Sequence, residues 1–216
     1  MYSTVLFDLD GTLTDSGKGI INSAKYALKQ MNHKVPDDSE LRKFIGPPLV
    51  DSFRNYCGFT NEQAHKAVYE YRVYYKEKGI FENEVYDGVR DMLCALKENG
   101  KKIILATSKP EVFARIVLDH FDLTKYFDFI AGALTDETRN TKAQIIEHIL
   151  KSCNMTDTSD LVMVGDREHD VIGAKEHGID CIGVLYGYGS RAELETAGAK
   201  FIAKTPTDVV DIAINR

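Results

Sequence analysis

The chain has 216 residues, 44% of them hydrophobic, which is enough for a packed α/β core with a modest accessory domain. Its net charge of −6 argues against a nucleic acid polymer as partner, because such binders usually carry a basic face. No apolar run approaches the length of a membrane span, and no leader precedes the first strand, so we expect a cytoplasmic protein with no membrane partner.

The first predicted element is a short buried strand of a parallel sheet, over Ser3–Phe7. Asp8 and Asp10 follow it at the edge where α/β folds place their ligands. Gly11 permits a sharp departure from strand geometry, so both carboxylates can face one cleft. Taken alone, the segment would be better explained as an Asp-Gly turn with solvated acids.

Helical periodicity replaces the strand pattern after Asp15 and continues for about 65 residues. We interpret residues 16–82 as an inserted helical cap domain, and residues 1–15 with 83–216 as the catalytic core domain. Within the cap the pattern predicts a short helix near Ser39–Phe44, a helix over Leu49–Cys57, and a later helix whose capping box begins at Thr60. We expect substrate identity to be set in this cap, by Arg42, Lys43, Gly46 and Pro47.

From Tyr86 onward, helices and strands alternate, which predicts a doubly wound, Rossmann-like parallel sheet. The predicted strands are Lys102–Ala106, Phe129–Ala131, Leu161–Val164, Cys181–Leu185 and Phe201–Ile202. The predicted helices include one ending near Lys97, one starting at Pro110 and one over Lys142–Lys151. The cysteines lack CxxC spacing and are expected to be reduced thiols: Cys57, Cys94, Cys153 and Cys181.

A second acidic pair, Asp166 and Asp170, follows the strand that ends at Val164. If this strand adjoins the first one, up to four carboxylates converge, and one pair of like charges about 4 Å apart costs about 4 kcal/mol at an effective dielectric constant near 20. Such a cluster needs a cation. Oxygen ligands with room for water suit Mg²⁺ better than a soft metal.

The run from Asp8 to Thr12, the strand leading to Ser108, Lys142 and the Gly165-Asp166…Asp170 segment together resemble the four motifs of the haloacid dehalogenase superfamily of phosphatases. The helical insert and the segments 106–110 and 183–189 resemble its phosphoglycolate phosphatase-like branch. That branch also contains nucleotide 5'-phosphatases, pyrophosphatases and sugar phosphomutases. The resemblance spans the whole chain and implies an enzyme that uses Mg²⁺ on small phosphorylated metabolites. We expect the protein to be a monomer or weak dimer.

The chemistry needs a nucleophile and a separate proton carrier, and the two acids of the first motif suit these roles. Asp8 would form an aspartyl phosphate, while Asp10 would protonate the leaving group and then activate water. The resemblance assigns both roles in the same way, and implies that Asp8, the backbone carbonyl of Asp10, and Asp166 bind the metal. Asp170, one helical turn later, would hold metal-bound water or Lys142.

Phosphate binding is predicted for Gly11, Thr12, Ser108, Lys109 and Lys142. Exposed N–H groups at a helix start, with the Ser108 hydroxyl, can hold phosphate oxygens, although a capping hydroxyl is the simpler reading of that serine alone. Lys142 lies at a helix start, which is unfavourable for a cation, so neutralisation of Asp8 and phosphate would explain it. Arg139 is a weaker candidate for the same positive field.

Three alternatives to a phosphatase differ in how they fit these residues. A sugar phosphomutase would share every core residue, so the core motifs do not separate it from a phosphatase. A dehalogenase would not need Asp10, because halide leaves without a proton. A non-catalytic metabolite sensor would not need the full set of acids. The roles of Arg167 and His169, between the two later acids, stay open.

Overall fold

The computed structural model describes residues 1–136 and 138–215. The chain forms two compact units, one made of Met1–Thr14 and Val85–Arg216, and the other of Asp15–Glu84. We call them the core unit and the inserted unit. The assignment of domains to residues 1–15 with 83–216 and to residues 16–82 stays a prediction.

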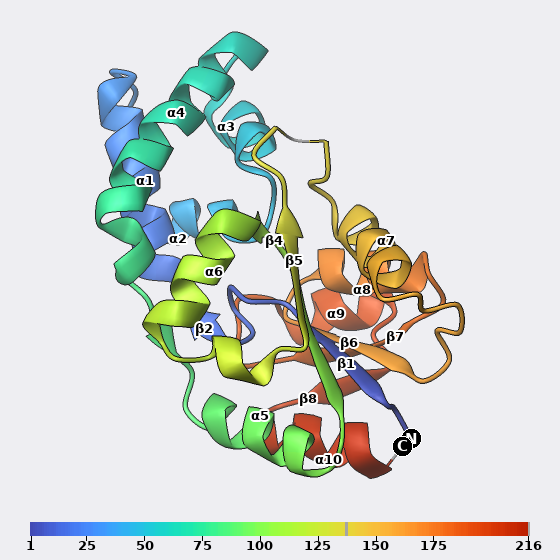
Figure 1. The fold of residues 1–216 in the computed structure, drawn as a ribbon. Helices are drawn as coiled ribbons and strands as arrows, with labels where there is room; N and C mark the ends of the chain where they lie inside the picture. The colour runs from blue at the N-terminus through green and yellow to red at the C-terminus, as the bar shows by residue number, and fades with distance from the viewer. Residues whose placement is uncertain (137, 216) are drawn as a thin grey trace. The chain divides into compact units, whose positions relative to one another are not determined.

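A six-stranded parallel sheet forms the centre of the core unit, with strand order β5-β4-β1-β6-β7-β8 (Figure 1). Strand β1 therefore lies between β4 and β6, and Phe7 pairs with Leu105 on one side and Val164 on the other. The carboxyl ends of β1, β4 and β6 consequently meet at one edge. The strands are β1 (Thr4–Phe7), β4 (Lys102–Pro110), β5 (Phe129–Ala133), β6 (Leu161–Gly165), β7 (Asp180–Val184) and β8 (Phe201–Ala203).

Helices cover both faces of this sheet, as the alternating pattern predicted. One face packs in a cluster that joins Leu6 and Ile104 to the apolar sides of α7, α8 and α9. Helices α5 and α10 pack together on the other face, and α6 packs on β4 and β5. The bounds are α5 (Val89–Glu98), α6 (Glu111–His120), the 3-10 turn η3 (Thr124–Tyr126), α7 (Lys142–Ser152), α8 (Glu168–Lys175), α9 (Arg191–Ala197) and α10 (Pro206–Asn215).

Strand β4 is longer than the sequence suggested, because it continues past Ala106 to Pro110. The prediction followed the apolar side chains, whereas the backbone ladder with β5 continues through polar residues, with a register shift between Thr107 and Pro110. Helix α6 consequently begins at Glu111 rather than at Pro110, and Ser108 lies within the strand.

The inserted unit is helical, and its longest helices, α1 and α4, pack against each other. Thr60 and Gln63 form the predicted capping box at the start of α4. The predicted helix near Ser39–Phe44 is instead a single α-turn followed by a 3-10 turn. The bounds are α1 (Gly17–Gln30), α2 (Asp38–Leu41), η1 (Arg42–Phe44), α3 (Leu49–Cys57), α4 (Asn61–Glu77) and η2 (Gly79–Phe81). The two-residue strands β2 (Thr14–Asp15) and β3 (Glu84–Val85) each take one residue from either unit.

Within the described ranges, no helix combines the length and the apolar character that crossing a bilayer requires. All four cysteines are free thiols, and Cys181 is buried in β7.

Candidate active site

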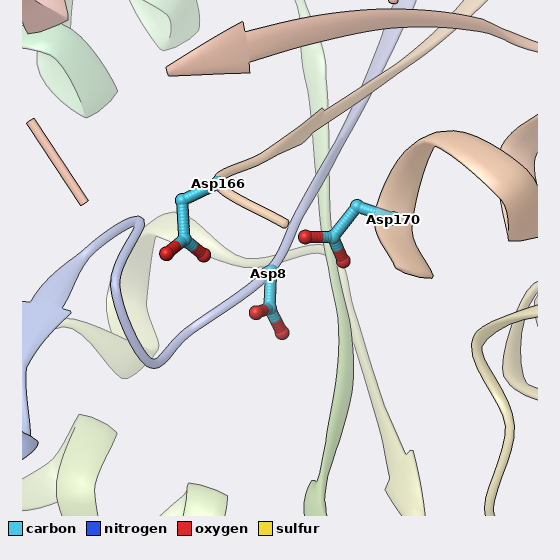
Figure 2. Close-up of side chains that lie close together, drawn as sticks. All are labelled: Asp8, Asp166 and Asp170. Atoms are coloured by element: carbon cyan, nitrogen blue, oxygen red, sulfur yellow. The ribbon is translucent and has the colours of Figure 1, made fainter. Parts of the chain in front are cut away.

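Asp8 and Asp166 follow two hydrogen-bonded neighbouring strands, β1 and β6, directly at their carboxyl ends. The backbone N–H of Asp8 still donates to the carbonyl of Val164, at 3.0 Å, so the sheet ladder fixes its position. Asp170 reaches the same place from the first turn of α8. Figure 2 shows the three carboxylates gathered at this edge. One oxygen of each lies within 4.8 Å of the others.

Lys142, the first residue of α7, connects two of these acids. Its Nζ lies 2.8 Å from Oδ1 of Asp8 and 2.8 Å from Oδ1 of Asp170, and it donates to the carbonyl of Ala106 at 2.7 Å. The Thr141 hydroxyl caps the helix by accepting from the N–H of Gln144. The unfavourable place of a cation at a helix start is thus offset by two carboxylates and a carbonyl.

Burial makes the charges of this cluster expensive unless they are matched. The pKa of Asp166 is raised well above its usual range, mainly by burial and then by the charges of Asp170 and Asp8. The hydrogen bond from the N–H of Tyr188 lowers this pKa but does not outweigh them. Burial would lower the pKa of Lys142, but Asp170 and Asp8 outweigh it and raise that pKa. When all three carboxylates are ionised, one ammonium leaves the cluster negative. An oxygen-only donor set with excess negative charge fits a divalent cation.

Asp10 is paired with a different lysine from the one that holds Asp8. Its two carboxylate oxygens accept from Nζ of Lys109 at 2.8 and 2.7 Å. The chain turns sharply here, with the N–H groups of Leu13 and Thr14 both donating to the carbonyl of Leu9. Lys109 therefore contacts the candidate proton carrier, and its predicted contact with phosphate stays a prediction.

The remaining predicted residues of the core unit divide into those near Asp166 and those farther away. The Thr12 hydroxyl lies 3.4 Å from Oδ1 of Asp166, and Gly11 takes a φ of +87° beside that carboxylate. Ser108 is half-buried in β4, three residues before α6 begins. Arg139 pairs with Glu111 at 3.2 Å and donates to the carbonyl of Gly132.

Two further groups of residues have placements that the sequence left open. Arg167 pairs with Glu193 at 2.7 Å, and His169 is half-buried in the first turn of α8. In the inserted unit the four cap candidates lie in η1 and the loop after it, where Nζ of Lys43 stands 5.8 Å from the ring centre of Tyr56. Those candidates are Arg42, Lys43 and Gly46, which are exposed, and Pro47, which is half-buried.

Sequence reasoning did not assign roles to the glycines that let the backbone approach these acids. A Cβ at Gly165 would lie 2.2 Å from the Asp170 side chain, and one at Gly173 would lie 2.7 Å from Cβ of Lys142. Gly187 and Gly189 stand equally close to Asp166. The glycine-rich run after β7 is the one sequence signal that could have indicated the last two.

Comparison with known proteins identifies the family of this chain. The profile of the haloacid dehalogenase-like hydrolase family matches residues 5–184. The chain is 44% identical to a 5'-nucleotidase of Pseudomonas aeruginosa over 89% of this chain and 87% of that protein. It is 41% identical to the tyrosine-protein kinase PtkA of Mycobacterium tuberculosis, over 95% of this chain and 67% of that protein.

A phosphoglycolate phosphatase of Pseudomonas aeruginosa is more distant, at 30% identity over 96% of this chain and 75% of that protein. Among solved structures, the crystal structure of a predicted phosphatase from Clostridium acetobutylicum matches with a TM-score of 0.96 and 46% identity, over 100% of both chains. The family match and these relatives support an enzyme of the phosphatase class, as the motifs predicted. The chain belongs to the haloacid dehalogenase-like hydrolase family.

Proposed function

We propose that this enzyme is a Mg²⁺-dependent phosphatase that hydrolyses small phosphate monoesters through an aspartyl phosphate on Asp8. One observation carries the proposal: Asp8 stands at the carboxyl end of the central strand, in contact with Lys142 and within 4.8 Å of Asp166 and Asp170. A carboxylate in this position can attack phosphorus. The buried ammonium, and a cation held by the acids, would neutralise the negative charge of the phosphate group.

Asp8 and Asp166, with the backbone carbonyl of Asp10, would hold the cation, and Asp170 would act through Lys142. When bound, Mg²⁺ would offset the negative charge of these acids and of the phosphate dianion. Lys142 would neutralise part of the same charge, since its Nζ already contacts Asp8. Thr12, which lies against Asp166, and Ser108, which lies within β4, would supply hydroxyl donors.

The reaction would proceed in two displacements. In the first, a carboxylate oxygen of Asp8 bonds to phosphorus, the ester P–O bond breaks, and the leaving alkoxide takes a proton from Asp10. In the second, Asp10 accepts a proton from water as the water oxygen attacks phosphorus, the acyl phosphate P–O bond breaks, and inorganic phosphate leaves. General acid–base transfer of this kind contributes about 100- to 10,000-fold.

A nucleoside 5'-monophosphate is the substrate class we favour. The 44% identity to a 5'-nucleotidase exceeds the 30% identity to a phosphoglycolate phosphatase, and both comparisons cover most of this chain. We favour phosphoglycolate and other small phosphomonoesters less than nucleoside monophosphates as substrates.

Phosphoryl transfer to a tyrosine hydroxyl is a second candidate, supported by the 41% identity to a protein named as a tyrosine-protein kinase. Chemically, an aspartyl phosphate could be intercepted by a phenol oxygen in place of water, so the same residues would serve both reactions.

The test is a phosphate-release screen of nucleoside monophosphates, phosphoglycolate and sugar phosphates with Mg²⁺, run beside an arm with ATP and a tyrosine peptide. We expect release from a nucleoside monophosphate, and its loss in Asp8→Asn by at least about a thousandfold with an unchanged circular dichroism spectrum. Turnover by pure Asp8→Asn would remove Asp8 as the nucleophile. Isomerisation of a sugar phosphate without phosphate release would favour the phosphomutase.

A further inference from the structure

The loop that follows β7 places its backbone against Asp166. The N–H of Tyr188 donates to Oδ2 of this carboxylate at 2.8 Å. A Cβ at Gly187 would lie 2.4 Å from Cβ of Asp166 and 2.2 Å from the carbonyl oxygen of Gly11, and one at Gly189 would lie 1.9 Å from the carbonyl oxygen of Asp166. These distances are far below the 3.5–4.0 Å at which non-bonded heavy atoms attract, so neither position has room for a side chain.

The turn after β1 closes in on the same carboxylate. A Cβ at Gly11 would lie 2.3 Å from Oδ2 of Asp166 and 2.7 Å from the ring of Tyr188, so the two segments also pack on each other. The Thr12 hydroxyl stands near the other oxygen, Oδ1, at 3.4 Å. Asp166 is fully buried as a result. Its carboxylate accepts from one backbone N–H and one hydroxyl, and neither belongs to the lysine that holds Asp8 and Asp170.

We propose that the loop Gly187-Tyr188-Gly189 is a positioning element for Asp166, which sets the orientation of its carboxylate before the metal binds. The Tyr188 N–H engages Oδ2, and the two glycines allow the loop to come close enough for that bond. A ligand whose rotamer is already fixed loses less side-chain freedom when the cation binds, and groups that orient metal ligands govern metal affinity. This inference rests on the proposed function, because it requires Asp166 to be a metal ligand.

The experiment measures Mg²⁺ binding to the substrate-free protein by isothermal titration calorimetry. Tyr188→Pro removes the N–H donor, and Gly187→Ala pushes the loop away from Asp166. We expect each variant to bind Mg²⁺ at least tenfold more weakly than the unaltered enzyme, within the 10- to 100-fold range typical of groups that orient metal ligands. Tyr188→Ala keeps the backbone donor and is expected to lose less than threefold.

Gly183→Ala is the matched control for general destabilisation, because Gly183 lies in β7 and a Cβ there would meet the Leu194 side chain at 2.9 Å rather than Asp166. Circular dichroism and thermal unfolding identify any variant that does not fold, and Tyr188→Pro and Gly187→Ala perturb the loop by different means. Folded Tyr188→Pro or Gly187→Ala protein with unchanged Mg²⁺ affinity would overturn the inference, as would an equal loss in Gly183→Ala. Absence of Mg²⁺ binding by the unaltered enzyme would instead refute the proposed function.

Discussion

The Lys109 ammonium spans both carboxylate oxygens of Asp10, and the lysine side chain is only 4% exposed. A buried ion pair is strongly destabilised when one partner is removed, because the other charge is left without a partner in a poorly solvated place. This contact joins β4 to Asp10, the candidate proton carrier, and we expect Lys109 to position that carboxylate.

Lys109→Met should therefore destabilise the protein more than a substitution that breaks an exposed ion pair. We expect a decrease in the free energy of unfolding of about 3 kcal/mol, near the lower end of measured losses for broken buried pairs, because Asp10 is partly accessible. Urea unfolding followed by circular dichroism measures it. Lys125→Met, which breaks an exposed pair with Asp122, is the control and should leave the midpoint unchanged.

The double variant Asp10→Asn with Lys109→Met separates the pair from other effects of the lysine. It removes both charges, so it should recover a large part of the stability lost by Lys109→Met. Strict additivity of the two single changes would mean that the pair contributes nothing and that Lys109 stabilises the fold through other contacts.

Asp10→Asn should impair the first displacement in proportion to the basicity of the leaving group. An aryl oxide leaves with little protonation, whereas an alkoxide needs the proton. The second displacement still lacks its base, so phosphoenzyme should accumulate with an activated aryl phosphate and give a burst in rapid-quench kinetics. Equal impairment for aryl and alkyl phosphates, without a burst, would exclude Asp10 from this dual role.

The sequence predicted the sheet because apolar runs that alternate with helical periodicity leave few other folds open. It indicated Lys142 through a cation in an unfavourable place, and the capping box of Thr60 through local spacing alone. It could not predict the partner of Lys109, because that contact depends on β4 extending to Pro110 beyond its apolar run.

The ion-pair partner of Arg139 was also not predictable from the sequence. The basic side chain of Arg139, three residues before Lys142, suggested a contribution to the phosphate field, which stays a prediction; the sequence did not indicate its ion pair with Glu111 at the start of α6. A charge pattern along the chain does not state which opposite charge lies nearest in space. The packing of Gly187 on Asp166 is likewise a tertiary contact between residues separated in sequence.

The buried acids should make the metal-free enzyme less stable as pH rises. A carboxyl whose pKa is raised on folding contributes stability at pH values below its unfolded pKa, near 4, and this stability is lost as pH rises through the folded pKa. Asp166 has its pKa raised by burial and by Asp170 and Asp8. Asp166→Asn should therefore have a higher melting temperature than the unaltered protein at pH 8 without metal, by about 2–4 °C for each kcal/mol relieved.

That advantage should shrink at pH 5, where less of the stability has been lost from the unaltered protein. It should also shrink when Mg²⁺ is added, because a bound cation stabilises the unaltered protein and not the variant. Chelation should stop turnover and Mg²⁺ should restore it. Differential scanning calorimetry at both pH values, with and without Mg²⁺, measures the two effects on the melting temperature. A lower melting temperature for Asp166→Asn at pH 8, or full activity in metal-free buffer, would contradict the assignment of this cluster as a cation site.

The cap residues allow a test of recognition that is separate from catalysis. Arg42 and Lys43 are both exposed in the inserted unit. If one contacts the non-reacting part of an anionic substrate, its replacement by Ala should lower kcat/KM for that substrate by about 10- to 100-fold, or about 1.4–2.7 kcal/mol, and spare a small aryl phosphate. The aryl ester reports the shared chemistry alone, because it lacks the group that the cation would recognise.

Lys66→Ala is the matched control, since Lys66 is an exposed lysine of the same unit, on α4. It should change neither substrate's kcat/KM, which separates a specific contact from the loss of one positive charge anywhere on the unit. Lys43 also stands near the Tyr56 ring, so Lys43→Ala can disturb η1 itself. Such a disturbance would affect both substrates equally. An equal change for the anionic substrate and the aryl ester in both cap variants would therefore remove the specificity role from this segment.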